Sequence, residues 1–276
     1  RDYIFLWLGI DSVCGVSSRS LVIPTILTDV ARRRAIMPSE TEILSIVKAL
    51  DWKSAGDAFG EAPELAEFRD VRGRSLLHHC AMVNVSGDDD LTAENSLKMA
   101  SLLIEKGLDP SEEAFARGNW KATPLWHTVS LGKNVKLAEF LLNKDCDPNH
   151  CLWSACFDNN EEVIRLLVSH GADVDPIYEN EETPLMTAVK GGHWEAAKTL
   201  LDLGADVNYQ DSNKRTSLHW ALKNRATKDQ VRILLENGAK GDIRDVDGDT
   251  SQEIMMRKKD PEYQTMASEF FPEASE

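Results

Sequence analysis

The sequence predicts an all-α fold built from repeated helix–turn–helix units, and three observations support this class. Residues 182–206 encode two short amphipathic helices separated by Gly191-Gly192. The same pattern returns at intervals of about 33 residues. Each unit also carries more apolar surface than one helical pair can cover, so neighbouring units must stack to bury it.

The stretch 182–206 shows how one unit is encoded. Thr183 can accept hydrogen bonds from the free N–H groups at a helix start, and Pro184 fits the first helical position because its missing N–H has no partner there. Gly191-Gly192 breaks this helix, and Gly204 supplies the left-handed stop of the next one. The residues expected on the buried stripes are Leu185, Ala188, Val189, Ala196, Ala197, Leu200 and Leu201.

The recurrence of this unit is the strongest signal in the chain. Thr-Pro-Leu at 183–185 returns 33 residues later as Thr-Ser-Leu at 216–218. Gly-Ala-Asp at 204–206 also stands at 171–173, and Gly-Ala stands at 238–239. A constant period in this range is typical of stacked repeats. We therefore expect the helical pairs to share one continuous apolar spine.

The repeated motif resembles the ankyrin repeat, whose pattern runs D-x-x-G-x-T-P-L-H-x-A-A, a short loop, a Leu-rich second helix and G-A-D-V-N. The resemblance extends over roughly residues 70–250, and the fourth and fifth units match best. It implies an ankyrin-repeat solenoid of helix–turn–helix units with short hairpin loops and helical terminal caps. It also implies a non-enzymatic scaffold that mediates protein–protein interaction.

Four segments are expected from the composition along the chain. Residues 1–36 form an N-terminal extension with five Arg and three Asp, whereas the remainder carries a net charge of −17. The extension has three interpretations: a helical cap, sequence upstream of a natural start at Met37, or, less favoured, a targeting sequence. Residues 37–68 are expected to form an N-terminal helical cap, 69–259 the repeat array and 260–276 a loosely held C-terminal tail.

The array contains about five to six units, and the third is shortened. Only 26 residues separate Asp145 from Gly171, against the usual period of about 33. The residues from His150 to Cys156 enter a helix almost at once, so the hairpin loop of this unit is expected to be missing. Fewer contacts at this joint should make it the weakest in the stack.

Charge and cysteine content restrict the function classes. The 276-residue chain has a net charge of −15, which argues against nucleic acid and membranes and favours a partner protein with a basic surface patch. Its five Cys show no paired spacing, which fits a reducing, cytoplasmic location. No apolar run approaches the roughly 20 residues that span a bilayer. We expect a monomer.

The sequence gives little support for catalysis. It contains no Gly-rich phosphate loop, no G-x-S-x-G and no H-E-x-x-H, so we expect neither an enzyme nor a cofactor. His78 and His219 occupy the motif's His position, where the resemblance implies a structural role. The five-residue spacing of Cys146, Cys151 and Cys156 does not suit zinc, and we expect no metal site.

A binding surface is the more defensible prediction. The resemblance implies that first helices and hairpin tips line a concave face, and aromatic and Arg side chains are frequent interface hot spots. The alternative is an acidic inhibitor or antagonist that blocks an enzyme or toxin with a basic surface. The candidate partner-binding residues are Trp120, His127, Ser130, Ser154, Phe157, Asn180, Glu182, Thr187, Lys190, Asn213, Arg215, Trp220 and Lys223.

Overall fold

The computed structural model describes residues 38–85, 90–117, 120–177 and 181–272. The N-terminal extension 1–36 and Met37, with the three interpretations placed on them, lie outside the described residues. Residues 38–276 form one compact unit. The description below concerns that unit alone.

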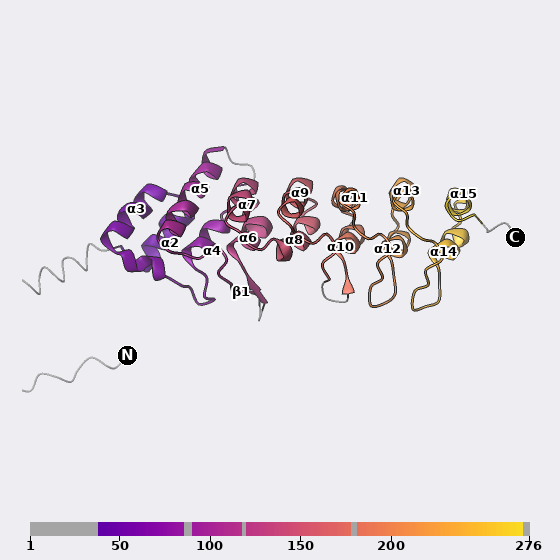
Figure 1. Ribbon diagram of the computed structural model, residues 1–276, viewed down its shortest axis with the longest axis horizontal. Coiled ribbons are helices and arrows are strands. Elements are labelled where there is room, and N and C mark those ends of the chain that lie inside the picture. The colour runs from indigo at the N-terminus through magenta and orange to yellow at the C-terminus, as the bar shows by residue number, and fades with distance from the viewer. Residues whose placement is uncertain (1–37, 86–89, 118–119, 178–180, 273–276) are drawn as a thin grey trace, which may run out of the picture. The chain divides into compact units, whose positions relative to one another are not determined.

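The described helices form two parallel rows, and each helical pair stacks on the next (Figure 1). The inner row consists of α2 (Glu40–Lys48), α4 (Leu76–Ala81), α6 (Pro124–His127), α8 (Leu152–Phe157), α10 (Pro184–Gly191), α12 (Ser217–Lys223) and α14 (Ser251–Arg257). The outer row consists of α3 (Trp52–Glu61), α5 (Asp90–Glu105), α7 (Val135–Leu142), α9 (Glu161–Ser169), α11 (Trp194–Asp202), α13 (Lys228–Glu236) and α15 (Pro261–Phe270). Short helical turns add η1 (Pro63–Glu67), η2 (Thr128–Gly132) and η3 (Asn149–Cys151).

The predicted capping signals set the helix boundaries. The Thr183 side chain accepts a hydrogen bond from the Met186 N–H, and Pro184 is the first residue of α10. Gly192 ends that helix with a φ of 75°, and Gly204 follows α11 with a φ of 94°. A side chain at these two positions would be strained, because positive φ disfavours any residue with a Cβ.

The apolar spine is continuous through both rows. Leu185 and Leu218, which the period placed at equivalent positions, and Leu200 of the second helix are fully buried in one hydrophobic core. That core extends from Ile43 in α2 to Met266 in α15. The predicted all-α ankyrin-type solenoid is therefore confirmed, and its stability comes from burial between neighbouring pairs.

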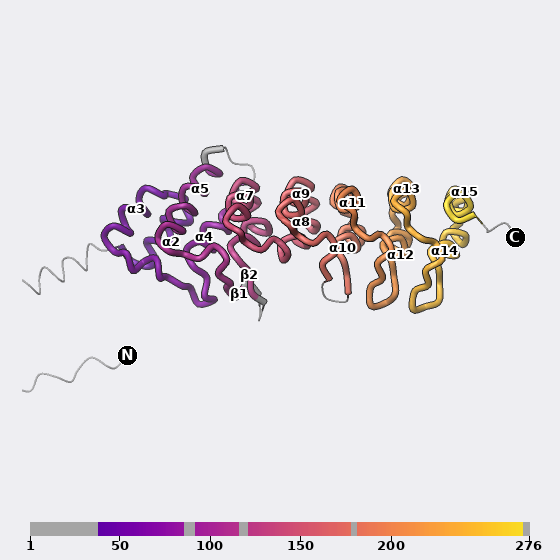
Figure 2. The backbone as a smooth tube through the Cα atoms, viewed as in Figure 1, coloured from indigo at the N-terminus to yellow at the C-terminus, as the bar shows by residue number. Residues whose placement is uncertain are grey.

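Loops project from the array where one unit passes to the next, and we call these loops fingers (Figure 2). The finger before α6 contains the antiparallel strands β1 (Ala114–Arg117) and β2 (Trp120–Ala122). The finger before α14 closes with a single bridge between Arg244 and Thr250. In contrast, the chain before α8 passes through η3 straight into the helix, as the shortened third unit predicted.

Residues 260–272 differ from the expected loose tail. Asp260 caps α15 by accepting a hydrogen bond from the Glu262 N–H, and the helix buries Met266 and Ala267 against the core. The apolar positions of α15 are few, and neighbouring acidic residues concealed them in the sequence. The last helical pair is therefore complete, and α13 contacts α15 as α7 contacts α9.

Hydrogen exchange should be faster in residues 146–156 than in α10 and α11. The third unit lacks the finger that adds contacts between neighbouring units, and local opening follows the density of such contacts. The measurement is native-state exchange with mass-spectrometric peptide mapping. Slower exchange in 146–156 than in the fourth unit would contradict the expectation.

Candidate protein-binding surface

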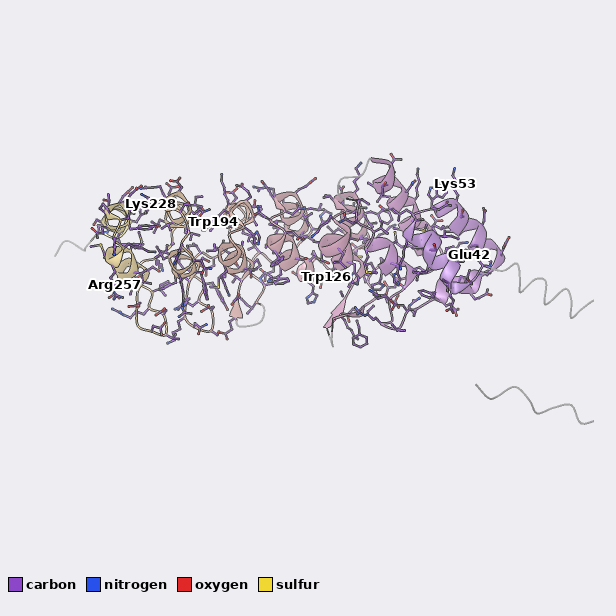
Figure 3. The ribbon with its side chains drawn as sticks, turned by 180° about the vertical axis from the view of Figure 1, so that it is seen from behind. Glu42, Lys53, Trp126, Trp194, Lys228 and Arg257 are labelled. Atoms are coloured by element: carbon purple, nitrogen blue, oxygen red, sulfur yellow. The ribbon has the colours of Figure 1, made fainter. Side chains whose placement is uncertain are left out.

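The exposed sides of the inner helices and the fingers next to them form one surface, which we call the inner face. It is made by α6 with η2, α8, α10 and α12. Figure 3 shows Trp126 and Arg257 along the inner row, with Trp194 and Lys228 along the outer row. Most of the candidate residues predicted from the sequence lie on the inner face.

The candidate residues divide into three groups by accessibility. Phe157, Lys223 and Asn213 are exposed, and Phe157 has 57% of its surface accessible. Asn180 and the side chain of Trp120 lie outside the described part of the chain. The half-buried candidates are Ser130, Glu182, Thr187, Lys190, Arg215 and Trp220.

Two candidates are buried. His127 is 2% exposed and packs edge-on against the His78 ring, with 5.7 Å between centroids. Ser154 is 6% exposed within α8. Because both side chains are shielded from solvent, we leave them out of the proposed contact surface. The hydroxyl of Ser130 is accessible but donates to the carbonyl oxygen of Trp126 at 2.8 Å.

Four of the predicted residues gather around the ring of a fifth, Trp220. The Lys190 Nζ lies 4.4 Å from the Trp220 ring centroid, and the Arg215 and Lys223 cations lie 5.4 and 5.7 Å from it. The Lys190 Nζ also forms an ion pair with Glu182 at 2.6 Å. Cations over an indole face are attracted by its quadrupole. These residues come from separate units, so stacking brings them together.

A hydrogen bond to a buried carboxylate fixes the Trp220 ring at the centre of this cluster. Trp220 Nε1 donates to the buried Asp211 carboxylate at 3.0 Å. Arg215 links two fingers through ion pairs with Asp245 at 3.4 Å and Asp247 at 2.9 Å. Burial acts to raise the pKa of Asp245, but hydrogen bonds from the Asp249 and Asp247 amides and from Arg215 outweigh it and lower the pKa. The carboxylate therefore stays charged and holds both fingers.

The structure adds Trp153, a surface residue that the candidate set omitted. Trp153 is 41% exposed and stacks on Phe157, with 5.7 Å between ring centroids, and the Phe157 ring also contacts His193. The equivalent residues His78, Met186 and His219 are buried. Trp153 is exposed because no finger covers the start of α8. The sequence contains two signals that together indicate this exposure: a Trp at the motif's His position, and the missing hairpin loop that would cover it. Neither signal alone predicts an exposed aromatic side chain.

The His219 side chain stabilises a helix start, and the Cys80 and Cys156 thiols are buried in the core. His219 Nδ1 lies 2.9 Å from the Thr216 hydroxyl and accepts from the Thr216 N–H, which closes the helix start. Burial raises the pKa of the Cys80 and Cys156 thiols to about 12, so neither is a nucleophile at neutral pH. Among the described residues, no three His, Cys, Asp or Glu side chains form a group that could hold a metal ion.

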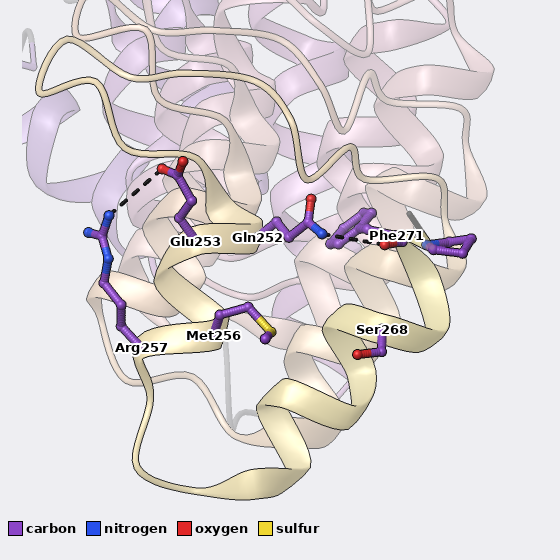
Figure 4. Close-up of a pocket in the computed structure, with 7 residues that line it drawn as sticks. Gln252, Glu253, Met256, Arg257, Ser268 and Phe271 are labelled. Carbon is purple, nitrogen blue, oxygen red and sulfur yellow. Dashed lines mark hydrogen bonds and ion pairs between the residues drawn. The ribbon is translucent and has the colours of Figure 1, made fainter. Parts of the chain in front are cut away.

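A pocket of about 480 Å³ lies at the last helical pair (Figure 4). Gln252 donates to the carbonyl oxygen of Phe271 at 3.3 Å, and Arg257 pairs with Glu253 at 3.8 Å. None of the candidate residues lines this pocket. Its lining residues are Gln252, Glu253, Met256, Arg257, Ser268, Phe271 and Pro272.

Stacked helical pairs with fingers along one side define a helical repeat protein, and most of its candidate residues lie on an extended surface instead of in a pocket. The model of the family described as "Ankyrin repeats (3 copies)" matches residues 90–178 and 152–245, which together span more than half of the chain. The chain belongs to the ankyrin repeat family. Membership supports a scaffold that binds other proteins.

Individual relatives and a solved structure agree with this assignment. The chain is 38% identical over 104 residues to ankyrin repeat and KH domain-containing protein 1 of Homo sapiens, covering 37% of this chain and 4% of that protein. It is 31% identical over 145 residues to putative ankyrin repeat protein FPV022 of Fowlpox virus, covering 51% and 24%. It therefore spans a quarter or less of these relatives. The human ASB11 ankyrin repeat domain shares the fold, with a TM-score of 0.65, 16% identity and coverage of 84% of this chain and 99% of that one.

In the part of the chain that the structure describes, every helix falls short of the length and hydrophobicity that a bilayer-spanning segment needs.

Proposed function

We propose that this protein is a non-enzymatic scaffold that binds another protein through its inner face. The observation that carries the proposal is the cluster of Glu182, Lys190, Arg215, Trp220 and Lys223. Aromatic and Arg side chains held in place by neighbouring contacts are typical of interface hot spots. Family membership supports the same class of function.

The binding mechanism is preorganisation. Association normally costs about 0.5–1.5 kcal/mol for each rotamer-rich side chain that becomes immobilised. Lys190, Arg215 and Trp220 are already held by ion pairs and by the hydrogen bond to Asp211. A partner that docks on them therefore loses less conformational entropy on this side of the interface.

The proposal also includes a partner with a basic surface, a cytoplasmic location and a monomeric state. The net charge of −15 favours encounter with a partner that carries a basic patch, or inhibition of a protein with a basic surface. The free thiols of Cys80, Cys146, Cys151 and Cys156 fit a reducing, cytoplasmic location. We propose a monomer as the acting species.

Replacing Phe157 and Trp220 by Ala should weaken partner capture by about tenfold or more, because truncated hot-spot side chains typically cost about 2 kcal/mol each. The measurement compares proteins captured from source-cell lysate by the full chain and by Phe157→Ala/Trp220→Ala. Phe140→Ala, a half-buried aromatic substitution on outer helix α7, serves as the matched control. Thermal melting should show all three proteins folded.

Two outcomes would count against the inner face. Equal capture by the wild type and the double variant would remove it as the contact surface. Loss of capture by Phe140→Ala, with capture kept by the double variant, would move the interface to the outer row.

A further inference from the structure

The charges of the array are divided between its two rows. The inner helices from α6 to α14, with the residue that caps each C-terminal end, carry five basic side chains and two acidic ones. The outer helices from α7 to α15 carry five basic and nine acidic side chains. Among these helices the acidic excess therefore lies on the outer row, while the inner row carries a basic excess.

The inner-face cations differ in how far they are already neutralised. Lys133 pairs with Asp158, Lys190 with Glu182, and Arg257 with Asp249. Lys223 and Arg225, at the end of α12, are exposed and form no ion pair with another described residue. These two side chains are available to a carboxylate from outside.

An apolar contact area lies on α8, two units before the Lys223 and Arg225 cations. The stacked rings of Trp153 and Phe157 cover the outward side of α8, and His193 extends this surface from the next unit. The His193 ring lies against Gly191, where a Cβ would overlap it. Gly191 therefore lets the imidazole reach Phe157, which makes the aromatic surface continuous.

The separation of the two sites fits a short extended segment. Packed helices lie about 8–10 Å apart, so α8 and α12 are separated by about 16–20 Å along the row. An extended chain advances about 3.3–3.6 Å per residue. Five or six residues of a partner therefore span the distance from the aromatic pair to the free cations.

We propose that the inner face binds an extended acidic segment of a partner protein, in which a bulky apolar side chain precedes or follows a pair of carboxylates by five or six residues. The apolar side chain packs on Trp153 and Phe157, and the carboxylates bind Lys223 and Arg225. This proposal rests on the proposed function and specifies the chemistry of the segment. Electrostatic complementarity at the end of α12 selects for acid, although the whole chain is acidic, because Lys223 and Arg225 are exposed there and the inner helices carry a basic excess.

Fluorescence anisotropy with the full chain and four labelled synthetic peptides tests this proposal. The first peptide places one tryptophan five residues from two glutamates in a Gly/Ser background. The second shortens that spacing to two residues, the third replaces the glutamates by lysines, and the fourth replaces the tryptophan by serine. The first peptide should bind at least tenfold more tightly than each of the other three.

Protein variants locate the two contacts. Lys223→Glu/Arg225→Glu and Trp153→Ala/Phe157→Ala should each weaken binding of the first peptide by at least tenfold. Lys198→Glu, an equivalent charge change at an exposed position on outer helix α11, should change it less than twofold. Circular dichroism of each variant checks that the array remains folded.

The proposal is overturned if the lysine peptide binds as tightly as the glutamate peptide, if no peptide binds, or if Lys198→Glu weakens binding as much as the α12 double variant. The proposed function would survive any of these results, provided that Phe157→Ala/Trp220→Ala still weakens capture of the natural partner by about tenfold or more. Equal capture by that variant would instead remove the inner-face scaffold itself.

Discussion

Lowering the pH from 7 to 4.5 should reduce the free energy of unfolding by several kcal/mol. His78 and His127 pack against each other at the joint between the first two repeats, and His79 is buried beside Phe68 and Asp70. Both ring nitrogens of His127 lack a hydrogen-bond partner in the described structure. Burial, followed by the nearby cations, lowers the pKa of His79 to about 4 and that of His127 to about 3. Burial likewise lowers the pKa of His78.

The direction of this effect follows from proton linkage. An unfolded histidine has a pKa of about 6.5, so between pH 6.5 and 4.5 the unfolded chain binds protons that the folded chain does not. The stabilisation from these neutral rings is complete above pH 6.5 and falls as the pH decreases. The slope is about 1.4 kcal/mol per pH unit for each such histidine, hence roughly 2–3 kcal/mol each for His79 and His127 by pH 4.5. A domain's total stability is only about 5–15 kcal/mol.

The neighbouring charges do not reverse the sign. Asp70 lies 3.2 Å from His79 Nε2 and favours its protonation, but burial and Arg74 outweigh it. Burial raises the pKa of Asp70, yet hydrogen bonds from Arg74 outweigh burial and lower it to about 2. The stability that Asp70 contributes is therefore lost only between pH 4 and 2, below the histidine range.

Urea unfolding at pH 7, 6, 5 and 4.5 measures this dependence. His127→Gln should lower stability at pH 7 and make the pH dependence shallower by about one proton, because one buried titrating group is gone. A free energy of unfolding that stays constant from pH 6.5 to 4.5 would contradict the assignment of these rings as buried and neutral.

The second large effect is expected at Gly132. A Cβ on this residue would overlap the carbonyl oxygen of Ala81 in the preceding unit, and the Gly132 carbonyl accepts from the Val85 N–H at 3.1 Å. Backbone atoms at a packed joint cannot move away cheaply, so Gly132→Ala should destabilise the protein by about 1–3 kcal/mol or more. The measurement is the change in urea midpoint and in Tm.

Gly191→Ala provides the matched control for that variant. Its added Cβ would meet only the His193 ring, which can rotate away, and replacing Gly by Ala within a helix favours folding by about 0.5–1 kcal/mol. The net change in stability should therefore be small. Equal destabilisation by the two variants would show that the α4–η2 joint is looser than the structure describes.

The sequence predicts the fold well because each repeat states its own boundaries. The caps Thr183 and Thr216 and the stop Gly204 are local signals, and their period reports the stacking. Helix α15 was missed because it lacks such a period, and its burial depends on contacts with α13. Where the local sequence pattern does not specify a helix, as in residues 261–270, contacts with neighbouring helices determine whether one forms.

The candidate surface was less predictable than the fold. His127 and Ser154 occupy motif positions that face the partner side in the family, yet both are buried here. Trp153 shows the reverse, because a shortened loop exposed a position that is normally covered. The net charge of the whole chain also gives no sign of the basic excess on the inner helices, because a sum over the sequence cannot separate the inner row from the outer row.

Charge alternates across the array in three layers. The outer helices from α7 to α15 carry an acidic excess, the inner helices a basic one, and the described fingers before α10, α12 and α14 an acidic one again. The fields of opposite layers cancel with distance, and salt screens what remains beyond about one Debye length, roughly 8–10 Å at physiological salt. A charged neighbour therefore senses a single layer only at close range, where ionic strength controls the strength of the attraction.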